Sequence, residues 1–216
     1  MKLFGYWRSS ATYRIRILLN LKGVAYDYEA VDLRAGDQRG VAHLARNPQA
    51  LVPVLETDGG KRLVQSQAIA EYLEETIPEP SILPKSPEDR ARARAIAAAI
   101  ACEAQPFMNL RVQQYLKQDV GLDDPSVHDW LQHWGGGAMK AVESLIDAQG
   151  QFAVGDAPGL AEAFIVPQLY AAQRFKLNLD ALPRMKRVAA ACAELAAFQD
   201  AHPDAQPDAQ PDVQGR

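Results

Sequence analysis

The chain has 216 residues, a net charge of −4 at pH 7 and 48% hydrophobic residues, enough for two modest cores and no electrostatic case for binding nucleic acid. No apolar run approaches the roughly 18 residues of a membrane span, and the first residues lack the apolar region of a signal peptide. Cys102 and Cys192 have no metal-ligand spacing and are expected to be small buried hydrophobes. We therefore expect a cytoplasmic protein that binds no metal, nucleic acid or membrane.

The first eighty residues mix short strand patterns with helical ones. Helical spacing of apolar residues follows Ser10 and stops at Gly23, and a second helical pattern starts at Ser66 and ends at Pro78. Strand patterns occupy four segments: 2–6, 25–33, 52–57 and 62–65. A β-α-β unit followed by a hairpin and a helix is the order of a thioredoxin-like α/β domain, which we place over residues 1–80.

The second half of the chain reads as entirely helical. The ten residues 78–87 include four prolines, and we expect the domain linker there. Beyond it, apolar residues at helical spacing fill four segments: 90–120, 127–148, 160–175 and 182–200. These predict an all-α domain over residues 88–202. The remaining residues repeat PDAQ and have almost nothing to bury, so 203–216 is predicted to be a disordered tail.

The segment Arg8-Ser9-Ser10-Ala11-Thr12, which carries three hydroxyl side chains, lies where the first predicted strand is followed by the first predicted helix. Hydroxyls at a helix N-terminus are usually caps, and this is the better interpretation for Ser10 or Thr12. The same position also combines free backbone N–H groups with the positive end of the helix dipole, which would stabilise a thiolate. Because this segment has no cysteine, the thiol would have to come from a ligand.

Two further positions are suited to an extended peptide. Pro53 either starts a strand or forms a cis bond with Val52, which would turn the Val52 main chain outward to pair with a peptide. Gln65 and Ser66 begin a helix; a cap explains Ser66, but a hydroxyl and N–H groups at a helix N-terminus also bind carboxylates. A peptide paired with Val52 could place its carboxylate there.

In this order and spacing, these motifs resemble the zeta class of glutathione transferases, which includes maleylacetoacetate and maleylpyruvate isomerases. The zeta signature, Ser-Ser-Cys-Ser, any residue, then Arg-Val-Arg-Ile-Ala-Leu, is similar to residues 9–19. The other matching segments are 47–53, 65–75, 105–110 and 174–176. The resemblance extends from residue 1 to about residue 200. It implies the glutathione transferase architecture and a homodimer.

The sequence departs from the family at several positions. Ala11 replaces the signature cysteine, which is tolerable if the catalytic thiol belongs to glutathione. Gly159 and Glu162 replace the usual Ser or Thr and Asp that cap a core helix, and they are expected to keep half of a capping box. Family members vary at Arg111. Most of the other arginines are expected on the solvated surface.

The resemblance implies isomerisation of a cis double bond conjugated to a carbonyl, with glutathione as a cofactor. Thiolate addition, bond rotation and elimination would convert a maleyl-type keto diacid into its trans isomer. Ser9 would donate a hydrogen bond to the thiolate, with Arg8 beside it as the second catalytic residue. The residues assigned to glutathione are Ser9, Ser10, Gln38, Val52, Pro53, Gln65, Ser66, Gln105 and Asn109. The residues assigned to the dicarboxylate substrate are Arg8, Arg174 and Arg111.

Two other functions are compatible with the same sequence. A transferase of this class could use the same thiolate to conjugate or dehalogenate small electrophiles. A non-enzymatic interaction module could use the same fold, since fold alone does not fix function. Ser9, Val52-Pro53 and Gln65-Ser66 occur together, which argues against the module.

Overall fold

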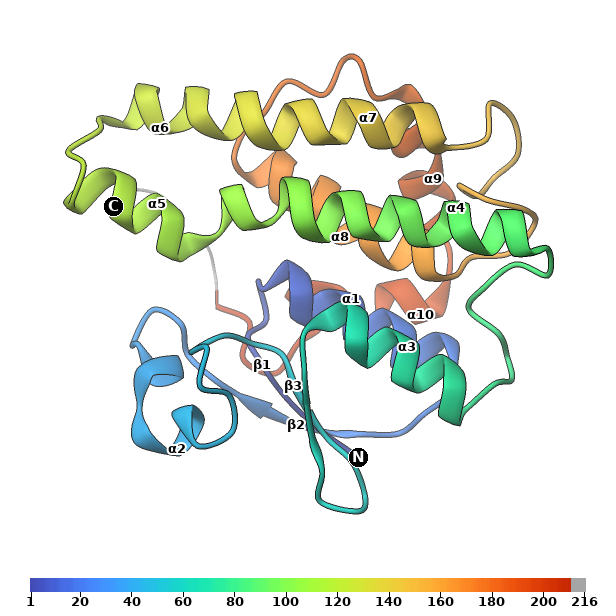
Figure 1. Ribbon diagram of the computed structural model, residues 1–216, viewed down its shortest axis with the longest axis horizontal. Coiled ribbons are helices and arrows are strands. Elements are labelled where there is room, and N and C mark those ends of the chain that lie inside the picture. Colours follow the sequence, from blue (N-terminus) through green and yellow to red (C-terminus); the bar gives the residue numbers. More distant parts are fainter. Residues whose placement is uncertain (211–216) are drawn as a thin grey trace. The chain divides into compact units, whose positions relative to one another are not determined.

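The computed structural model describes residues 1–210 and divides into two compact units (Figure 1). The first unit joins Met1–Ser81 to the residues from Glu194 onward, and the second is Ile82–Ala193. The expected helical domain over 88–202 therefore continues too far, because α10 (Ala196–Gln199) belongs with the first unit. Within residues 1–210, no helix is both long and apolar enough to cross a membrane.

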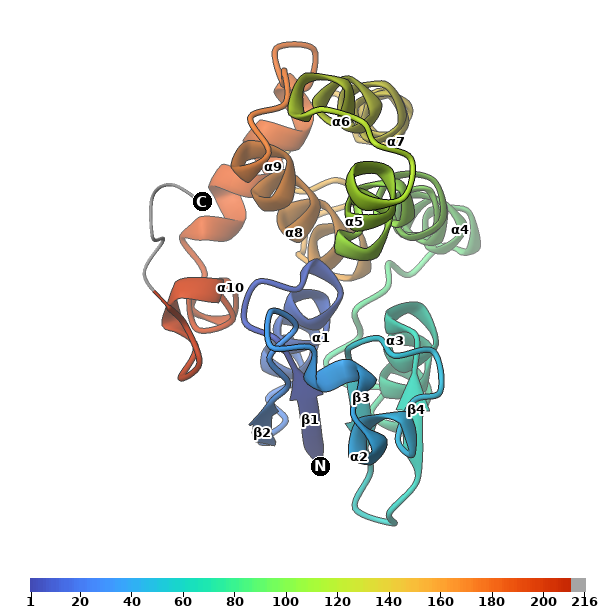
Figure 2. The ribbon, with the colours of Figure 1, turned by 90° about the vertical axis from the view of Figure 1, so that its left-hand side faces the viewer.

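A four-stranded sheet forms the centre of the first unit, in the order β2-β1-β3-β4 (Figure 2). The strands are β1 (Lys2–Gly5), β2 (Asp27–Ala30), β3 (Val54–Glu56) and β4 (Arg62–Val64). β1 pairs in parallel with β2 and antiparallel with β3, and β3 pairs antiparallel with β4. The β-α-β unit and hairpin predicted from the sequence are therefore confirmed, with shorter strands.

Helices α1 (Ser10–Leu21) and α3 (Ser66–Thr76) pack against each other on one side of the sheet (Figure 2). Their apolar faces supply the core, in which Ile15, Leu18, Ile69 and Leu73 are fully buried. Short helical turns η1 (Asp37–Arg39) and α2 (Val41–Leu44) occupy the connection between β2 and β3.

The second unit is built from helices, and residues 82–193, all of them described, form no strand. Its elements are α4 (Pro87–Ala98), η2 (Ala99–Ala104), η3 (Pro106–Met108), α5 (Leu110–Gln118), α6 (Asp124–Leu131), η4 (Gln132–Gly136), α7 (Gly137–Leu145), α8 (Leu160–Arg174) and α9 (Pro183–Ala193). η2 and η4 are π-helical turns that continue α4 and α6, so the long helical patterns of the sequence appear as interrupted helices. The all-α prediction is confirmed.

The expected half capping box of α8 is present. Glu162 is buried and accepts hydrogen bonds from the backbone N–H groups of Gly159 and Ala153, both at 2.7 Å. A Cβ on Gly159 would lie 2.2 Å from the Ile82 carbonyl oxygen, so this close approach requires glycine. Burial raises the pKa of Glu162, while the two hydrogen bonds oppose that shift.

The prediction of a disordered tail is wrong for residues 203–210. Pro203 is buried at the start of the turn η5 (Pro203–Ala205), and the Gln206 amide donates to the carbonyl oxygens of Asp200 and His202 at 2.8 and 2.9 Å. The segment is held by proline burial and single polar contacts, neither of which produces an apolar stripe in the sequence. The rest of the predicted tail, 211–216, lies outside the described residues.

Candidate functional site

Strand register brings three of the sequence motifs to one end of the sheet. Phe4 of β1 lies opposite Val54 of β3, and Val54 lies opposite Val64 of β4. Residues that follow β1, precede β3 and follow β4 therefore emerge at the same end of the sheet. These are the Arg8–Ser10 turn, Val52-Pro53 and Gln65-Ser66, respectively. A peptide that contacts all three would need to span only this end of the first unit.

Ser9 is the N-cap of α1. Its Oγ accepts a hydrogen bond from the Thr12 backbone N–H at 3.2 Å, and its own N–H donates to the Tyr6 carbonyl at 2.9 Å. The prediction that Ser10 or Thr12 is the cap is therefore wrong: Ser10 is already the first helical residue, and Thr12 is fully buried. Because the Ser9 oxygen accepts from the backbone, its O–H hydrogen can be donated to an anion.

The charge around Ser9 favours an anion. Among the described residues, the first turn of α1 holds no acidic side chain that would offset the positive end of the helix. Arg8 directly precedes Ser9, and its guanidinium carbon lies 4.2 Å from the centre of the Trp7 ring. A thiolate at Ser9 would therefore meet a helix N-terminus, a hydroxyl donor and a nearby cation.

The Val52–Pro53 peptide bond is cis, which confirms the second of the two readings of Pro53. β3 begins at Val54, so the main chain of Val52 lies outside the strand ladder. The carbonyl oxygen of Leu51 is held by His43 Nε2 and by the Asn47 amide, both at 2.9 Å. His43 is a residue that sequence reasoning missed, and it fixes the chain just before the cis bond.

Gln65, not Ser66, is the N-cap of α3, so the capping role predicted for Ser66 is wrong. Gln65 has a φ of +69°, a left-handed conformation that is uncommon outside glycine and often marks functional positions. Its amide donates to Gln49 Oε1 at 2.8 Å. This conformation leaves Ser66 as the first residue of α3, with its hydroxyl at the helix N-terminus.

A buried arginine lies beneath Ser66. Nη1 of Arg14 donates to Ser66 Oγ at 3.1 Å, and Arg14 is 1% exposed. The Ser66 oxygen is thus an acceptor, and its O–H hydrogen can be donated to a carboxylate. The expectation that most arginines are solvated does not hold for Arg14 or for Arg16, which is fully buried. In the sequence, the only indication of this role for Arg14 is its place within residues 9–19, the segment similar to the zeta signature.

Gln38, the remaining cofactor residue predicted in this unit, lies in η1. Its Oε1 is buried and has no hydrogen-bond partner within residues 1–210. A buried acceptor without a partner is costly, and a ligand N–H would satisfy it.

The other predicted residues belong to the second unit. Gln105 lies between η2 and η3, and Asn109 caps α5 by accepting from the Arg111 backbone N–H at 3.2 Å. Arg111 is exposed in the first turn of α5. Arg174 is the last residue of α8 and is also exposed, with its guanidinium carbon 4.8 Å from the Phe175 ring centre. Asn109 thus caps α5, and both arginines are exposed.

Known proteins resemble this chain over nearly its whole length. Residues 1–75 match the family model described as the glutathione S-transferase N-terminal domain. The chain is 49% identical to a maleylacetoacetate isomerase of Pseudomonas aeruginosa, over 94% of this chain and 96% of that protein. A holo structure of a maleyl pyruvate isomerase, a bacterial glutathione-s-transferase of the zeta class, matches at 42% identity with a TM-score of 0.93, covering 97% of this chain and 100% of that one.

A solved structure with a ligand bears on the chemistry. The maleylacetoacetate isomerase of Anaeromyxobacter dehalogenans, with dicarboxyethyl glutathione and citrate bound in its active site, matches at 47% identity with a TM-score of 0.86, covering 97% of each chain. Both of its ligands carry several carboxylates, the chemistry that helix N-termini and guanidinium groups bind.

Proposed function

We propose that this chain, which belongs to the zeta class of glutathione transferases, is a glutathione-dependent cis–trans isomerase of a maleyl-type keto diacid, maleylacetoacetate or maleylpyruvate. The observation that carries the proposal is the gathering of Ser9, the Val52–Pro53 cis bond and Ser66 at one end of the sheet. The chemistry that bound glutathione supplies is reversible addition of its thiolate to the alkene, which permits rotation before elimination restores the double bond.

The groups of the first unit fit glutathione as a cofactor. The main chain of Val52, outside the strand ladder, is available to pair with the peptide backbone. The Ser66 hydroxyl, held by Arg14, and the N-terminus of α3 suit the glutamyl carboxylate. Gln38 Oε1 is a buried acceptor for a ligand N–H. Ser10, Gln65, Gln105 and Asn109 keep their assignment to glutathione on the resemblance.

Ser9 holds the thiolate in this proposal. Its hydroxyl donates to the sulfur, and the N-terminus of α1 adds the helix dipole. A pKa lowered by about two units from the ordinary 8.5 would leave most of the thiol ionised at pH 7. Arg8 supplies a cation for the negative charge that develops on the conjugated carbonyl oxygen.

The diacid needs cations that suit carboxylates. A guanidinium binds a carboxylate through two parallel N–H groups, and Arg8, Arg174 and Arg111 are the proposed partners. Arg8 follows from its place beside Ser9, while Arg174 and Arg111 follow from the resemblance.

The proposal is tested with a panel of four substrates: maleylacetoacetate, maleylpyruvate, a halogenated acid and a neutral aromatic electrophile. Each is assayed with and without glutathione. Turnover of one of the maleyl acids well above that of the other two, and only with glutathione, is the expected result. Faster reaction with the electrophile or the halogenated acid would instead identify a conjugating or dehalogenating transferase.

We also propose a homodimer and a cytoplasmic location, both on the family resemblance. Light scattering at micromolar concentration tests the first, with twice the 23.7 kDa chain mass expected. A monomer would contradict it. Fractionation of the native cells tests the location.

A further inference from the structure

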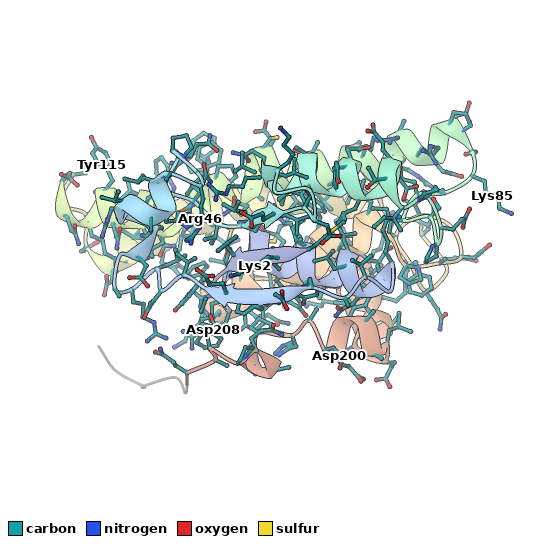
Figure 3. The ribbon with its side chains drawn as sticks, turned by 90° about the horizontal axis from the view of Figure 1, so that it is seen from below. Lys2, Arg46, Lys85, Tyr115, Asp200 and Asp208 are labelled. Atoms are coloured by element: carbon teal, nitrogen blue, oxygen red, sulfur yellow. The ribbon has the colours of Figure 1, made fainter. Side chains whose placement is uncertain are left out.

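The turn that carries Ser9 is held by residues from the far end of the sequence. We define the C-terminal segment as residues 200–210; it lies on the side of the first unit where the edge strand β2 is found (Figures 2 and 3). Oδ2 of Asp208 accepts two hydrogen bonds, from the Trp7 backbone N–H at 3.1 Å and from the Tyr28 hydroxyl at 3.1 Å. The first of these bonds joins residues 201 positions apart.

The main-chain carbonyl of Trp7 is held as well. Nη2 of Arg16 donates to the Trp7 carbonyl oxygen at 3.0 Å, and its Nε donates to the Ala201 carbonyl at 2.9 Å. Arg16 is fully buried. Both the N–H and the C=O of Trp7 are therefore bonded to groups that belong to the C-terminal segment or are anchored by it.

Apolar contact closes the same region. The Trp7 side chain is 1% exposed and belongs to a buried cluster that includes Val52. Ala209 of the C-terminal segment packs against this cluster. The C-terminal segment thus contacts the cluster that includes Val52, the residue assigned to pair with the main chain of glutathione.

Trp7 and Ser9 lie in the same hydrogen-bonded turn, so a shift of the Trp7 main chain would also move Ser9. The Ser9 N–H donates to the Tyr6 carbonyl at 2.9 Å, so residues 6–9 form one hydrogen-bonded turn with the Trp7 peptide inside it. Loss of the contact at Trp7 N–H would let this turn shift, and displacements near 1 Å in catalytic groups can cost roughly 100-fold in rate.

The protonation state of Tyr28 supports its role as the hydrogen-bond donor to Asp208. Burial, and secondly the negative charge of Asp208, raise the pKa of Tyr28. Its phenol therefore stays protonated through neutral pH and remains the donor to Asp208.

We propose that Asp208 is a positioning residue: through the Trp7 backbone, it and the C-terminal segment hold the Ser9 hydroxyl where it stabilises the glutathione thiolate. This deepens the proposed function and rests on it for the role of Ser9. Asp208 itself touches neither cofactor nor substrate in this proposal.

The PDAQ repeat offers a matched pair of variants. Asp204 and Asp208 occupy the same place in successive repeats, but Asp204 is exposed and its Oδ2 lies 3.6 Å from Nδ1 of its neighbour His202. We compare Asp208→Ala with Asp204→Ala, and with Asp208→Asn, whose amide oxygen can still accept both hydrogen bonds. Thermal unfolding of each variant establishes that it is folded.

The decisive readout is the pH at which bound glutathione ionises, followed by the ultraviolet absorbance of the thiolate without any diacid present. Asp208→Ala should raise this pH by about one unit and lower kcat about tenfold, while the Kd of glutathione changes less than about threefold. Asp208→Asn should recover most of both losses, and Asp204→Ala should resemble the unmodified protein.

An Asp208→Ala protein that loses thermal stability but keeps the ionisation pH would overturn the proposal, since Asp208 would then be structural only. Equal losses in Asp208→Ala and Asp208→Asn would also overturn it, because the losses would then not depend on the hydrogen bonds that the Asn amide oxygen can still accept. Since the ionisation readout needs no diacid, it separates this proposal from the proposed function. A chain without isomerase activity but with the expected shift would refute only the latter.

Discussion

Ser9→Ala removes two interactions that can be separated by experiment. The hydroxyl caps α1 through Thr12 N–H, and a lost cap costs about 1 kcal/mol of stability. In the proposed function the same hydroxyl also donates to the thiolate, and a hydrogen bond to a charged group is worth about 1.5–3 kcal/mol. That range corresponds to roughly 10- to 150-fold in turnover and to an increase of about 1–2 units in the pKa of the bound thiol.

Ser9→Gly separates the two effects. Glycine is an acceptable N-cap that costs only about a few tenths of a kcal/mol, but it has no hydroxyl. We expect Ser9→Gly and Ser9→Ala to lose the same turnover, while only Ser9→Ala loses the full capping energy in urea unfolding. Ser10→Ala, measured at saturating glutathione because Ser10 is assigned to glutathione binding, is the matched control for the thiolate and should keep both kcat and the ionisation pH of bound glutathione. If Ser9→Gly kept full turnover, or if Ser10→Ala behaved like Ser9→Ala, the assignment of the thiolate donor to Ser9 would be refuted.

Three further predictions concern Ser66, Arg174 and Glu162. Ser66→Ala should raise the Kd of glutathione roughly 10-fold with a much smaller effect on kcat, because Ser66 is the proposed partner of the glutamyl carboxylate and not of the sulfur; a change in kcat alone would contradict this. Arg174→Ala should raise KM for the diacid, with a loss of about 1.5–3 kcal/mol in the binding free energy of the diacid, and Arg174→Lys should recover only part of that loss. An equal loss with a neutral electrophile would show that Arg174 has a structural role. Glu162→Gln should lower the free energy of unfolding by about 1–3 kcal/mol at pH 7, because an amide cannot accept from two backbone N–H groups through two oxygens. Because burial raises the folded-state pKa of Glu162 above its ordinary 4.5, the folded protein binds the proton more tightly, so the difference should widen as pH falls toward 4.5; a constant difference in urea titrations would refute the shift.

The sequence predicts the two-unit fold because periodic patterns record which face of an element is buried. The thioredoxin-like half and the helical half both follow from such patterns. Caps are less accessible, since Ser9 and Ser10 are equally good residues for the position and only the φ/ψ angles decide between them. Likewise, nothing in Gln65 itself indicates its left-handed backbone, which displaces the cap of α3 from Ser66.

The buried arginines and the C-terminal segment were missed for a common reason. Arg14, Arg16 and Asp208 have partners that are a hydroxyl or main-chain groups far along the chain, and such partners leave no local pattern. Charge on a helix is normally a sign of solvent exposure, so the general expectation of solvated arginines does not distinguish the two buried arginines of α1. A polar segment without apolar periodicity resembles a disordered one, even when single contacts such as the one at Asp208 anchor it.

The central claim is that glutathione acts as a regenerated cofactor for a cis–trans isomerisation. One reaction tests it: the cis diacid and the total thiol of glutathione are followed together, with substrate in large excess over glutathione. We predict complete conversion to the trans diacid while the thiol concentration stays constant. Consumption of one thiol per diacid, or the same rate without glutathione, would contradict the account.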